Sequence, residues 1–166
     1  MASKLPRLVR ELAMWLLIGV AVSLAVDYFR QPELPQNFAS AALQTLDGKP
    51  VDLIAMSEER PLLVYVWATW CGVCRYTTPS VSALAAEGGN VMSVALHSGD
   101  NDTLERWLAK KKMTLPTVND ASGSLSRQWD VQVTPTLVVI SHGEVKSITT
   151  GWTSSWGMRL RLWLAS

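Results

Sequence analysis

The two cysteines of this 166-residue chain, Cys71 and Cys74, stand three positions apart and limit the fold more than any other feature. The apolar run from Leu62 to Ala68 precedes them and predicts a buried strand, and the Ser-, Ala- and Leu-rich sequence after Arg75 predicts a helix. Cys71 is therefore expected where a strand turns into a helix. The unpaired N–H groups and positive dipole end of a helix start stabilise a thiolate, the nucleophilic form of cysteine.

This placement predicts a redox-active pair. Two cysteines three residues apart on one helix face are near enough to close a disulfide. Cys71, at the exposed end, is expected to attack a foreign disulfide, and Cys74, one turn deeper, to resolve the mixed disulfide. Trp70, Gly72 and Val73 flank the cysteines and are the expected substrate-contacting surface.

Other uses of the two cysteines are less favoured. A structural disulfide normally closes a long loop, whereas this one closes almost none. A zinc site needs four ligands, and His97 and His142 are the only histidines in the sequence, both far from the pair. Inert thiols are the remaining alternative. We therefore expect neither a metal nor a cofactor.

The stretch Trp67-Ala68-Thr69-Trp70-Cys71-x-x-Cys74 resembles the active-site motif of the thioredoxin superfamily. The later stretch Val133-Thr134-Pro135-Thr136, followed by an apolar run, resembles the cis-proline loop of the same superfamily. The resemblance implies a thiol:disulfide oxidoreductase in which the backbone of Thr134, beside cis-Pro135, pairs with an extended protein substrate. The alternative is an ordinary trans proline that opens an edge strand.

The segment from Leu115 to Val131 further resembles the membrane-anchored branch of TlpA-like and cytochrome-c-maturation thiol reductases. This branch implies a reductase of periplasmic protein disulfides that receives electrons from a transmembrane donor of the DsbD or ScsB kind. A Cu(I)-binding module built on Cys71 and Cys74 is the rival hypothesis, since thiolates suit Cu(I), and a non-catalytic adaptor is a weaker one. No Met-rich or His-rich cluster in the sequence favours copper.

One position departs from the thioredoxin pattern. That family places a buried aspartate six residues before its first cysteine, and Tyr65 stands there in this chain. The strand therefore offers no carboxylate to take the proton of Cys74. Glu87, Asp120 and Asp130 are candidate bases elsewhere in the sequence, and none of them is assigned.

The N-terminal residues predict a membrane anchor. Basic residues precede an uncharged run from Leu12 to Val26, and residues 8–29 would span roughly 33 Å as a helix, enough for a hydrocarbon core. The distribution of basic residues predicts that residues 1–7 lie in the cytoplasm and that the rest of the chain is exported. Together with the resemblance to the membrane-anchored branch, this implies a single-pass protein of the bacterial inner membrane with its catalytic domain in the periplasm. A signal peptide cleaved after Ser23-Leu24-Ala25 is the alternative.

Residues 30–37 contain two prolines and are expected to form a linker, and residues 38–166 are long enough for one thioredoxin-like domain. The net charge of +1 gives no electrostatic case for nucleic-acid binding. Alternating strands and helices followed by a hairpin predict an α/β sandwich with a mixed central sheet. The remaining expected elements are a hairpin over 42–53, a strand over 91–97, helices over 102–112, 124–129 and 154–165, and a hairpin over 136–150. Lys110, Lys111 and Lys112 are interpreted as the basic end of the helix over 102–112.

Overall fold

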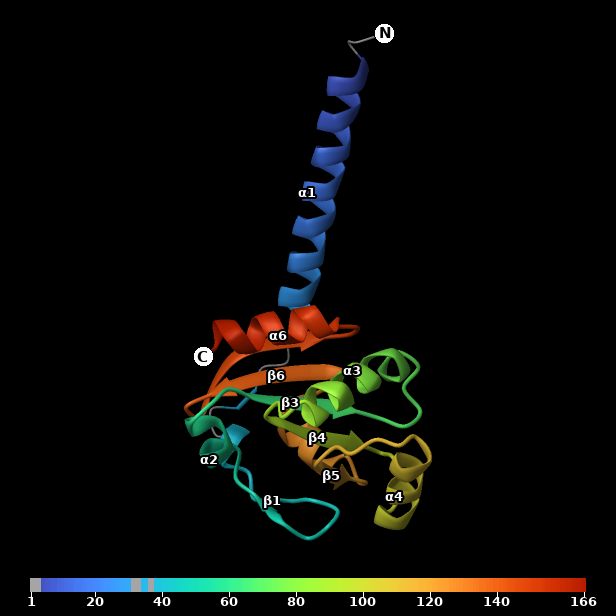
Figure 1. Ribbon diagram of the computed structural model, residues 1–166, viewed down its shortest axis with the longest axis vertical. Helices are drawn as coiled ribbons and strands as arrows, with labels where there is room; N and C mark the ends of the chain where they lie inside the picture. Colours follow the sequence, from blue (N-terminus) through green and yellow to red (C-terminus); the bar gives the residue numbers. More distant parts are fainter. Residues whose placement is uncertain (1–3, 31–33, 36–37) are drawn as a thin grey trace. The chain divides into compact units, whose positions relative to one another are not determined.

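The computed structural model describes residues 4–30, 34–35 and 38–166 of the chain. The chain divides into two compact units, Met1–Gln31 and Pro32–Ser166, and the first contains the helix α1, Lys4–Arg30 (Figure 1). This helix includes the segment 8–29, which was expected to be a membrane anchor. Of the helices that the described residues form, none meets both the length and the apolarity needed to cross a membrane.

The second unit is built on a mixed sheet, as the sequence predicted. Its strand order is β5-β4-β3-β6-β7, in which β3 runs parallel to β4 and β4 parallel to β5, whereas β6 is antiparallel to both β3 and β7. A separate small hairpin, β1 with β2, precedes the sheet in the chain. The strands are β1 Leu43–Gln44, β2 Pro50–Val51, β3 Leu62–Trp67, β4 Val91–Leu96, β5 Thr117–Asp120, β6 Thr136–Ser141 and β7 Glu144–Thr150.

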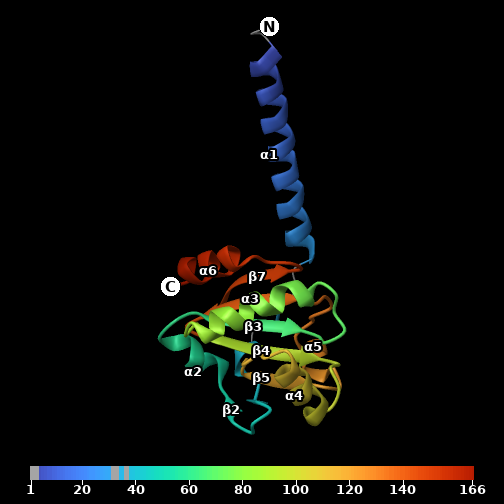
Figure 2. The same cartoon turned by 45° about the vertical axis from the view of Figure 1, so that its right-hand side comes forward.

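Both faces of the sheet are buried, which explains why β3 is apolar along its whole length. Leu63, Tyr65 and Trp67 point to the core that α3, α4 and α6 cover, and Leu62 and Val64 point to the opposite core around Phe38 and Trp129. Figure 2 shows α3 crossing in front of the sheet. The helices of this unit are η1 Phe38–Ser40, α2 Leu53–Glu58, α3 Cys74–Ala86, α4 Asn101–Lys110, α5 Ser124–Gln128 and α6 Ser155–Leu164.

The helix ends follow the expected local chemistry. Asp100 caps α4 by accepting a hydrogen bond from the N–H of Thr103, and Ser154 caps α6 in the same manner. Gly88 ends α3 with a φ of +85°, the left-handed conformation that glycine adopts most easily. These ends fix where the redox helix stops and where α4 begins.

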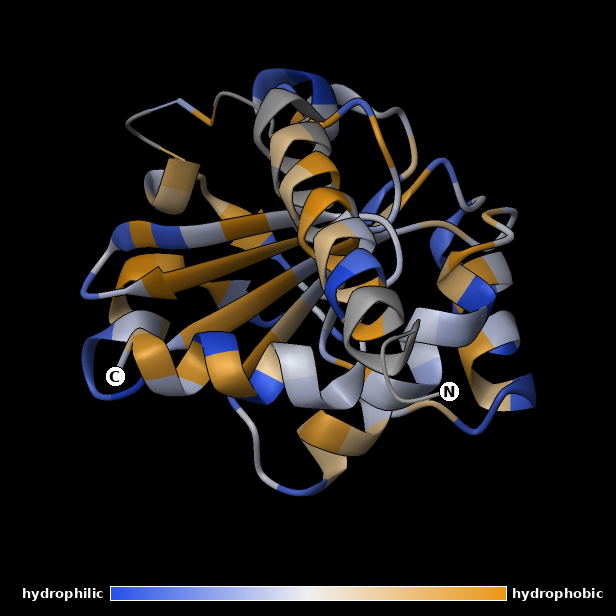
Figure 3. Cartoon of the chain, turned by 90° about the horizontal axis from the view of Figure 1, so that it is seen from above, coloured by the Kyte–Doolittle hydropathy of each residue, from blue (hydrophilic) through white to orange (hydrophobic). Residues whose placement is uncertain are grey.

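Two features differ from expectation. The strand β5 was not predicted, because Thr117-Val118-Asn119-Asp120 is short and carries a single strongly apolar residue. Trp152, Trp156 and Trp163 are exposed despite their large apolar side chains. Figure 3 shows the orange, apolar residues on α6, the helix beside the C label. Only one side of this helix packs on the core, through Met158 and Leu162.

Candidate active site

The turn after β3 places the two cysteines. β3 ends at Trp67, the N–H of Cys71 donates to the carbonyl of Ala68 at 3.2 Å, and α3 begins at Cys74. Cys71 therefore lies three residues before the helix and not in its first turn, a small correction to the expected position. The two cysteines form a disulfide with their Cα atoms 5.3 Å apart.

The start of α3 acts directly on the Cys71 sulfur. The N–H of Cys74 points at Cys71 Sγ, with the two atoms 3.1 Å apart. In the reduced protein such a donor, together with the helix dipole, stabilises the thiolate of Cys71. Cys71 was expected to be exposed, but both cysteines are buried: Cys71 is 8% exposed and Cys74 is 1% exposed. Cys71 remains the more accessible sulfur.

The loop before β6 supplies the second half of the site. The Thr134–Pro135 peptide bond is cis, as predicted. The carbonyl oxygen of Thr134 lies 3.5 Å from Cys71 Sγ, although the two residues are 63 positions apart. They meet because β3 and β6 are antiparallel neighbours, with Val66 paired to Thr136, so the end of one strand lies beside the start of the other.

Exposed apolar side chains lie close in the chain to the cysteine pair and to the Thr134–Pro135 loop. Trp70 and Val73 were expected at this surface and are 63% and 43% exposed. Tyr76 and Val133 are exposed as well and were not singled out from the sequence. Gly72, between the cysteines, has no heavy atom within 4 Å of the position of a Cβ, so the backbone is open to an approaching chain. We call Trp70, Val73, Tyr76 and Val133 the apolar rim of the site.

Two hydrogen bonds tie the cysteine turn to the loop after β4. The indole Nε1–H of Trp70 donates to the carbonyl of His97 at 3.1 Å, and the N–H of Thr69 donates to Ser98 Oγ at 3.0 Å. The first bond fixes the orientation of an otherwise exposed ring. The role of Ser98 has no local sequence signal, because its partner lies 29 positions away.

A cavity of about 320 Å³ reaches both sulfurs from the side of α3 and α4. Two cationic side chains, Arg75 and Lys111, line it, and none of its lining residues carries a carboxylate. Trp107 forms part of the wall, with Lys111 Nζ 5.9 Å from the centre of its ring. The lining residues are Ala68, Thr69, Cys71, Cys74, Arg75, Thr78, Pro79, Trp107, Lys111 and Met113.

Beneath the cavity, Tyr65 takes the position where thioredoxins carry an aspartate. Its hydroxyl lies 2.8 Å from Thr78 Oγ1, which donates in turn to the carbonyl of Cys74 at 2.7 Å. Because the single proton of Thr78 is used in that bond, Tyr65 is the donor to Thr78. Burial raises the pKa of Tyr65 above its ordinary value, so the group stays a neutral phenol.

The three carboxylates considered as bases are engaged elsewhere. Glu87 is ion-paired with Arg159, and Asp130 accepts a hydrogen bond from Gln132. Asp120 accepts the N–H groups of Leu125 and Ser126 at the start of α5. None of the three lines the cavity at the sulfurs.

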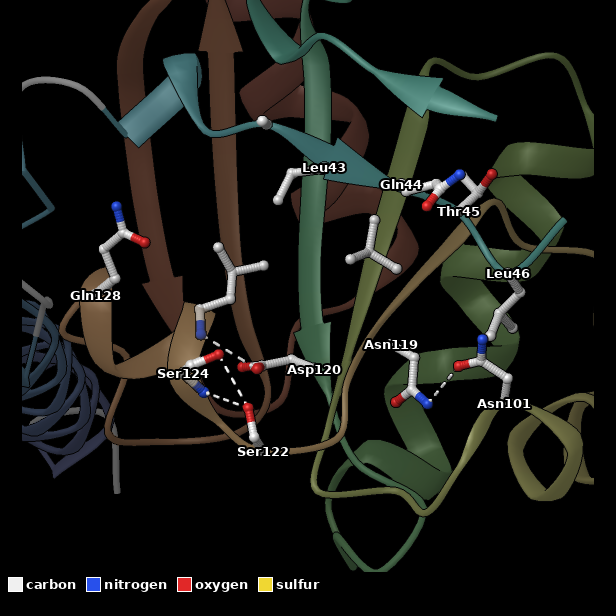
Figure 4. Close-up of a pocket in the computed structure, with 13 residues that line it drawn as sticks. Leu43, Gln44, Thr45, Leu46, Asn101, Asn119, Asp120, Ser122, Ser124 and Gln128 are labelled. Carbon is white, nitrogen blue, oxygen red and sulfur yellow. Dashed lines mark hydrogen bonds between the residues drawn. The ribbon is translucent and has the colours of Figure 1, made fainter. Parts of the chain in front are cut away.

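Asp120 instead lines a second pocket, of about 460 Å³, at the edge of the sheet between β1 and β5. Figure 4 shows its carboxylate directed toward the first residues of α5, and Asn119 bonded to Asn101 on the other side. The polar side chains in this pocket are mostly amides and hydroxyls, and neither cysteine is among its lining residues. Its polar groups thus hold the sheet edge to α4 and α5.

Comparison with known proteins agrees with this geometry. The AhpC/TSA family matches residues 35–148, most of the chain. The chain belongs to the AhpC/TSA family.

Its relatives in this family include thiol:disulfide proteins. A thioredoxin-like protein of Haemophilus influenzae is 38% identical over 162 residues, which cover 98% of this chain and 97% of that protein. The thiol:disulfide interchange protein DsbE of Pseudomonas fluorescens is 28% identical, covering 87% of this chain and 84% of the relative. A secreted disulfide oxidoreductase of Mycobacterium tuberculosis shares the fold, with a TM-score of 0.64 at 21% identity over 78% of this chain and 99% of that structure.

The family and the cysteine pair together establish the reaction class. The chain is a thioredoxin-like thiol:disulfide oxidoreductase with a Cys71-Gly72-Val73-Cys74 site.

Proposed function

We propose that this protein is a disulfide reductase of the periplasm in which Cys71 attacks client disulfides and Cys74 resolves them. The observation that carries the proposal is the N–H of Cys74 directed at Cys71 Sγ, because it favours the thiolate on Cys71. The greater burial of Cys74 supports the resolving role.

The proposed reaction is two successive thiol–disulfide exchanges. The Cys71 thiolate attacks one sulfur of the client disulfide, forming a mixed disulfide and releasing the other client sulfur as a thiolate. The Cys74 thiol then loses its proton, and its thiolate attacks Cys71 Sγ. The Cys71–Cys74 bond forms, the bond to the client breaks, and the second client thiolate leaves and takes up a proton. Two electrons pass from the cysteine pair to the client.

Client binding is proposed to use the backbone beside Pro135 and the apolar rim. The Thr134 carbonyl, close to Cys71 Sγ, can accept a hydrogen bond from an extended client segment laid across the site. Trp70, Gly72 and Val73 would contact that segment on the other side of the sulfur. The Cys71 thiolate then faces a client segment bound beside it.

Trapping tests the assignment of the two sulfurs. Cys74→Ser should accumulate mixed disulfides between Cys71 and client proteins, seen on non-reducing gels, because attack proceeds without resolution. Cys71→Ser is the matched control and should trap none. Equal trapping by the two variants, or trapping through Cys74 alone, would overturn the assignment.

The reduction potential of the pair tests the direction of electron flow. A reductase should give a value near that of thioredoxin, about −270 mV, whereas a value near that of DsbA, about −120 mV, would make the protein an oxidant. Equilibration of the full chain with glutathione or dithiothreitol, followed by alkylation and mass measurement, gives this potential.

We also propose that residues 8–29 anchor the protein in the inner membrane and that a transmembrane donor of the DsbD or ScsB kind keeps it reduced. The anchor proposal rests on the uncharged sequence from Leu12 to Val26 and on the exposed apolar side chains of α1, such as Trp15 and Leu16. Deleting residues 1–30 should move the protein from the membrane to the soluble fraction and keep its disulfide reductase activity. Membrane association that survives the deletion would refute the anchor.

The motifs also resemble the suppressor-of-copper-sensitivity D protein, which leads us to propose a role in copper tolerance or in cytochrome c maturation. Copper sensitivity and cytochrome c content of a deletion strain, complemented with the wild-type chain or with Cys71→Ser, separate the two roles. Unchanged values of both in the deletion strain would exclude both.

A further inference from the structure

The cavity beside the cysteines concerns one step of the proposed reaction, the loss of the proton from Cys74. This chain lacks the carboxylate that takes this proton in thioredoxins. The carboxylate that thioredoxins use is replaced by Tyr65, whose raised pKa keeps it protonated. The Tyr65 hydroxyl is the donor in its hydrogen bond to Thr78, so Tyr65 is not available as a base for Cys74. A different arrangement must make the buried thiol reactive.

The charged groups around the cavity are all cationic. Arg75 comes from the first turn of α3, and Lys111 follows α4 and lies close to the ring of Trp107. The other polar groups at this site are neutral: the Thr78 hydroxyl on α3, which lines the cavity, the Tyr65 hydroxyl on β3, which is bonded to it, and the Thr134 carbonyl beside Cys71 Sγ. Among the described residues, the ion pairs involve neither Arg75 nor Lys111, so no carboxylate there compensates their charge.

We propose that this cation-lined cavity replaces the missing base, with solvent in the cavity accepting the proton of Cys74 while Arg75 and Lys111 stabilise the thiolate that remains. The inference rests on the proposed resolving role of Cys74. Positive charge near a thiol favours its ionised form. A cavity of about 320 Å³ has room for several water molecules that can carry the proton away.

The step balances without a further reagent. Water in the cavity takes the proton from Cys74 Sγ, and the Cys74 thiolate attacks Cys71 Sγ in the mixed disulfide. The client sulfur leaves with the bonding electron pair and is protonated by solvent. Arg75 and Lys111 are positioning residues, because they act through the charge on Cys74 and do not exchange protons with it.

The ionisation of Cys74 can be measured by itself, because the chain has two cysteines and replacing Cys71 leaves Cys74 as the remaining thiol. In full-length Cys71→Ser, absorbance at 240 nm follows ionisation of Cys74, with Cys71→Ser/Cys74→Ser subtracted as the cysteine-free background. Adding Arg75→Gln and Lys111→Gln should raise the pKa of Cys74 by about 1, the low end for a nearby charge because both side chains are exposed. The same titration in 1 M salt should raise the pKa of Cys74 in Cys71→Ser and change it little in the triple variant.

A matched control removes the same charge outside the cavity. Lys110 and Lys112 flank Lys111 in the chain and do not line the cavity. Lys110→Gln with Lys112→Gln, in the Cys71→Ser background, should leave the pKa of Cys74 nearly unchanged. An equal rise in both sets, or no rise with Arg75→Gln and Lys111→Gln, would overturn the inference.

The kinetics give a second readout in the otherwise native chain. At neutral pH, a rise of about 1 in the pKa of Cys74 lowers its thiolate fraction about tenfold and raises its nucleophilicity about threefold, so resolution slows about threefold. Arg75→Gln/Lys111→Gln should show this slowing in single-turnover release of a mixed disulfide, and should lose it as the pH rises above the pKa. If the wild-type chain reduces no disulfides, the proposed function fails, and the titration of Cys74 still tests this inference. If the wild-type chain reduces disulfides but Arg75→Gln and Lys111→Gln leave the pKa of Cys74 unshifted, this inference alone is refuted.

Discussion

The hydroxyl pair beneath Cys74 makes a prediction about stability that depends on which group donates. Tyr65 donates to Thr78, and Thr78 donates to the carbonyl of Cys74. Tyr65→Phe removes a donor and leaves every buried donor satisfied, so it should lower the free energy of unfolding by about 1 kcal/mol. Thr78→Val leaves the Tyr65 hydroxyl buried without a partner and should cost about 2 kcal/mol.

The double variant is the sharper test. Replacing both residues removes the orphaned hydroxyl, so Tyr65→Phe/Thr78→Val should cost about 1.5 kcal/mol, below the sum of about 3 kcal/mol for the single changes. Urea unfolding of the oxidised chain, followed by tryptophan fluorescence with unchanged m values, measures the four free energies. Strictly additive costs, or a larger cost for Tyr65→Phe than for Thr78→Val, would refute the assigned donor.

The same residue predicts a loss of stability at alkaline pH. The folded pKa of Tyr65 is raised by burial, whereas the unfolded chain ionises this tyrosine near pH 10. Its contribution is therefore complete below about pH 10 and is lost as the pH rises toward the folded value. Tyr65→Phe should flatten the decline in unfolding free energy between about pH 9 and 11, and Tyr76→Phe, at an exposed tyrosine, should not.

Three further substitutions test the core and the helix starts. Trp129→Ala should cost about 3 to 5 kcal/mol in urea unfolding, because the ring is fully buried and its centre lies 4.3 Å from that of Phe38. Asp120→Ala should cost roughly 3 kcal/mol by the same measurement, since two backbone N–H groups lose their acceptor. The hydrogen bond from Thr103 lowers the pKa of Asp100, so its stabilising effect is present above about pH 4 and is lost as the pH falls through the folded pKa. Asp100→Asn should keep the cap and flatten the fall in melting temperature between about pH 5 and 2, whereas an unchanged slope would contradict the assignment.

The redox turn could be predicted from the sequence because its determinants are local. An apolar run, a Cys-x-x-Cys pair and a helix-forming sequence follow one another directly, so β3, the disulfide and α3 were all expected. The cis bond before Pro135 was predicted from a second short motif. In each case the residues that carry the signal are neighbours in the chain.

The features that were missed depend on distant residues. β5 owes its place to pairing with β4, since its own four residues include one strongly apolar side chain. Lys111 was interpreted as the basic end of a helix, and only packing of the end of α4 against the cysteine turn makes it part of the cavity. Trp156 and Trp163 have apolar side chains but are exposed, because burial depends on which side of α6 packs on the sheet.

The pairing of β3 with β6 has a consequence for how proteins of this design can diversify. Cys71 follows the end of β3 and Thr134 precedes the start of β6, just beyond the pair Val66 and Thr136, while the chain between them runs through β4, α4 and β5. Apart from the loop after β4, which is bonded to the cysteine turn, surface loops in that part of the chain can be lengthened or exchanged without altering the spacing of Cys71 and Thr134. The range of clients can thus change by loop replacement while the electron-transfer chemistry is inherited intact.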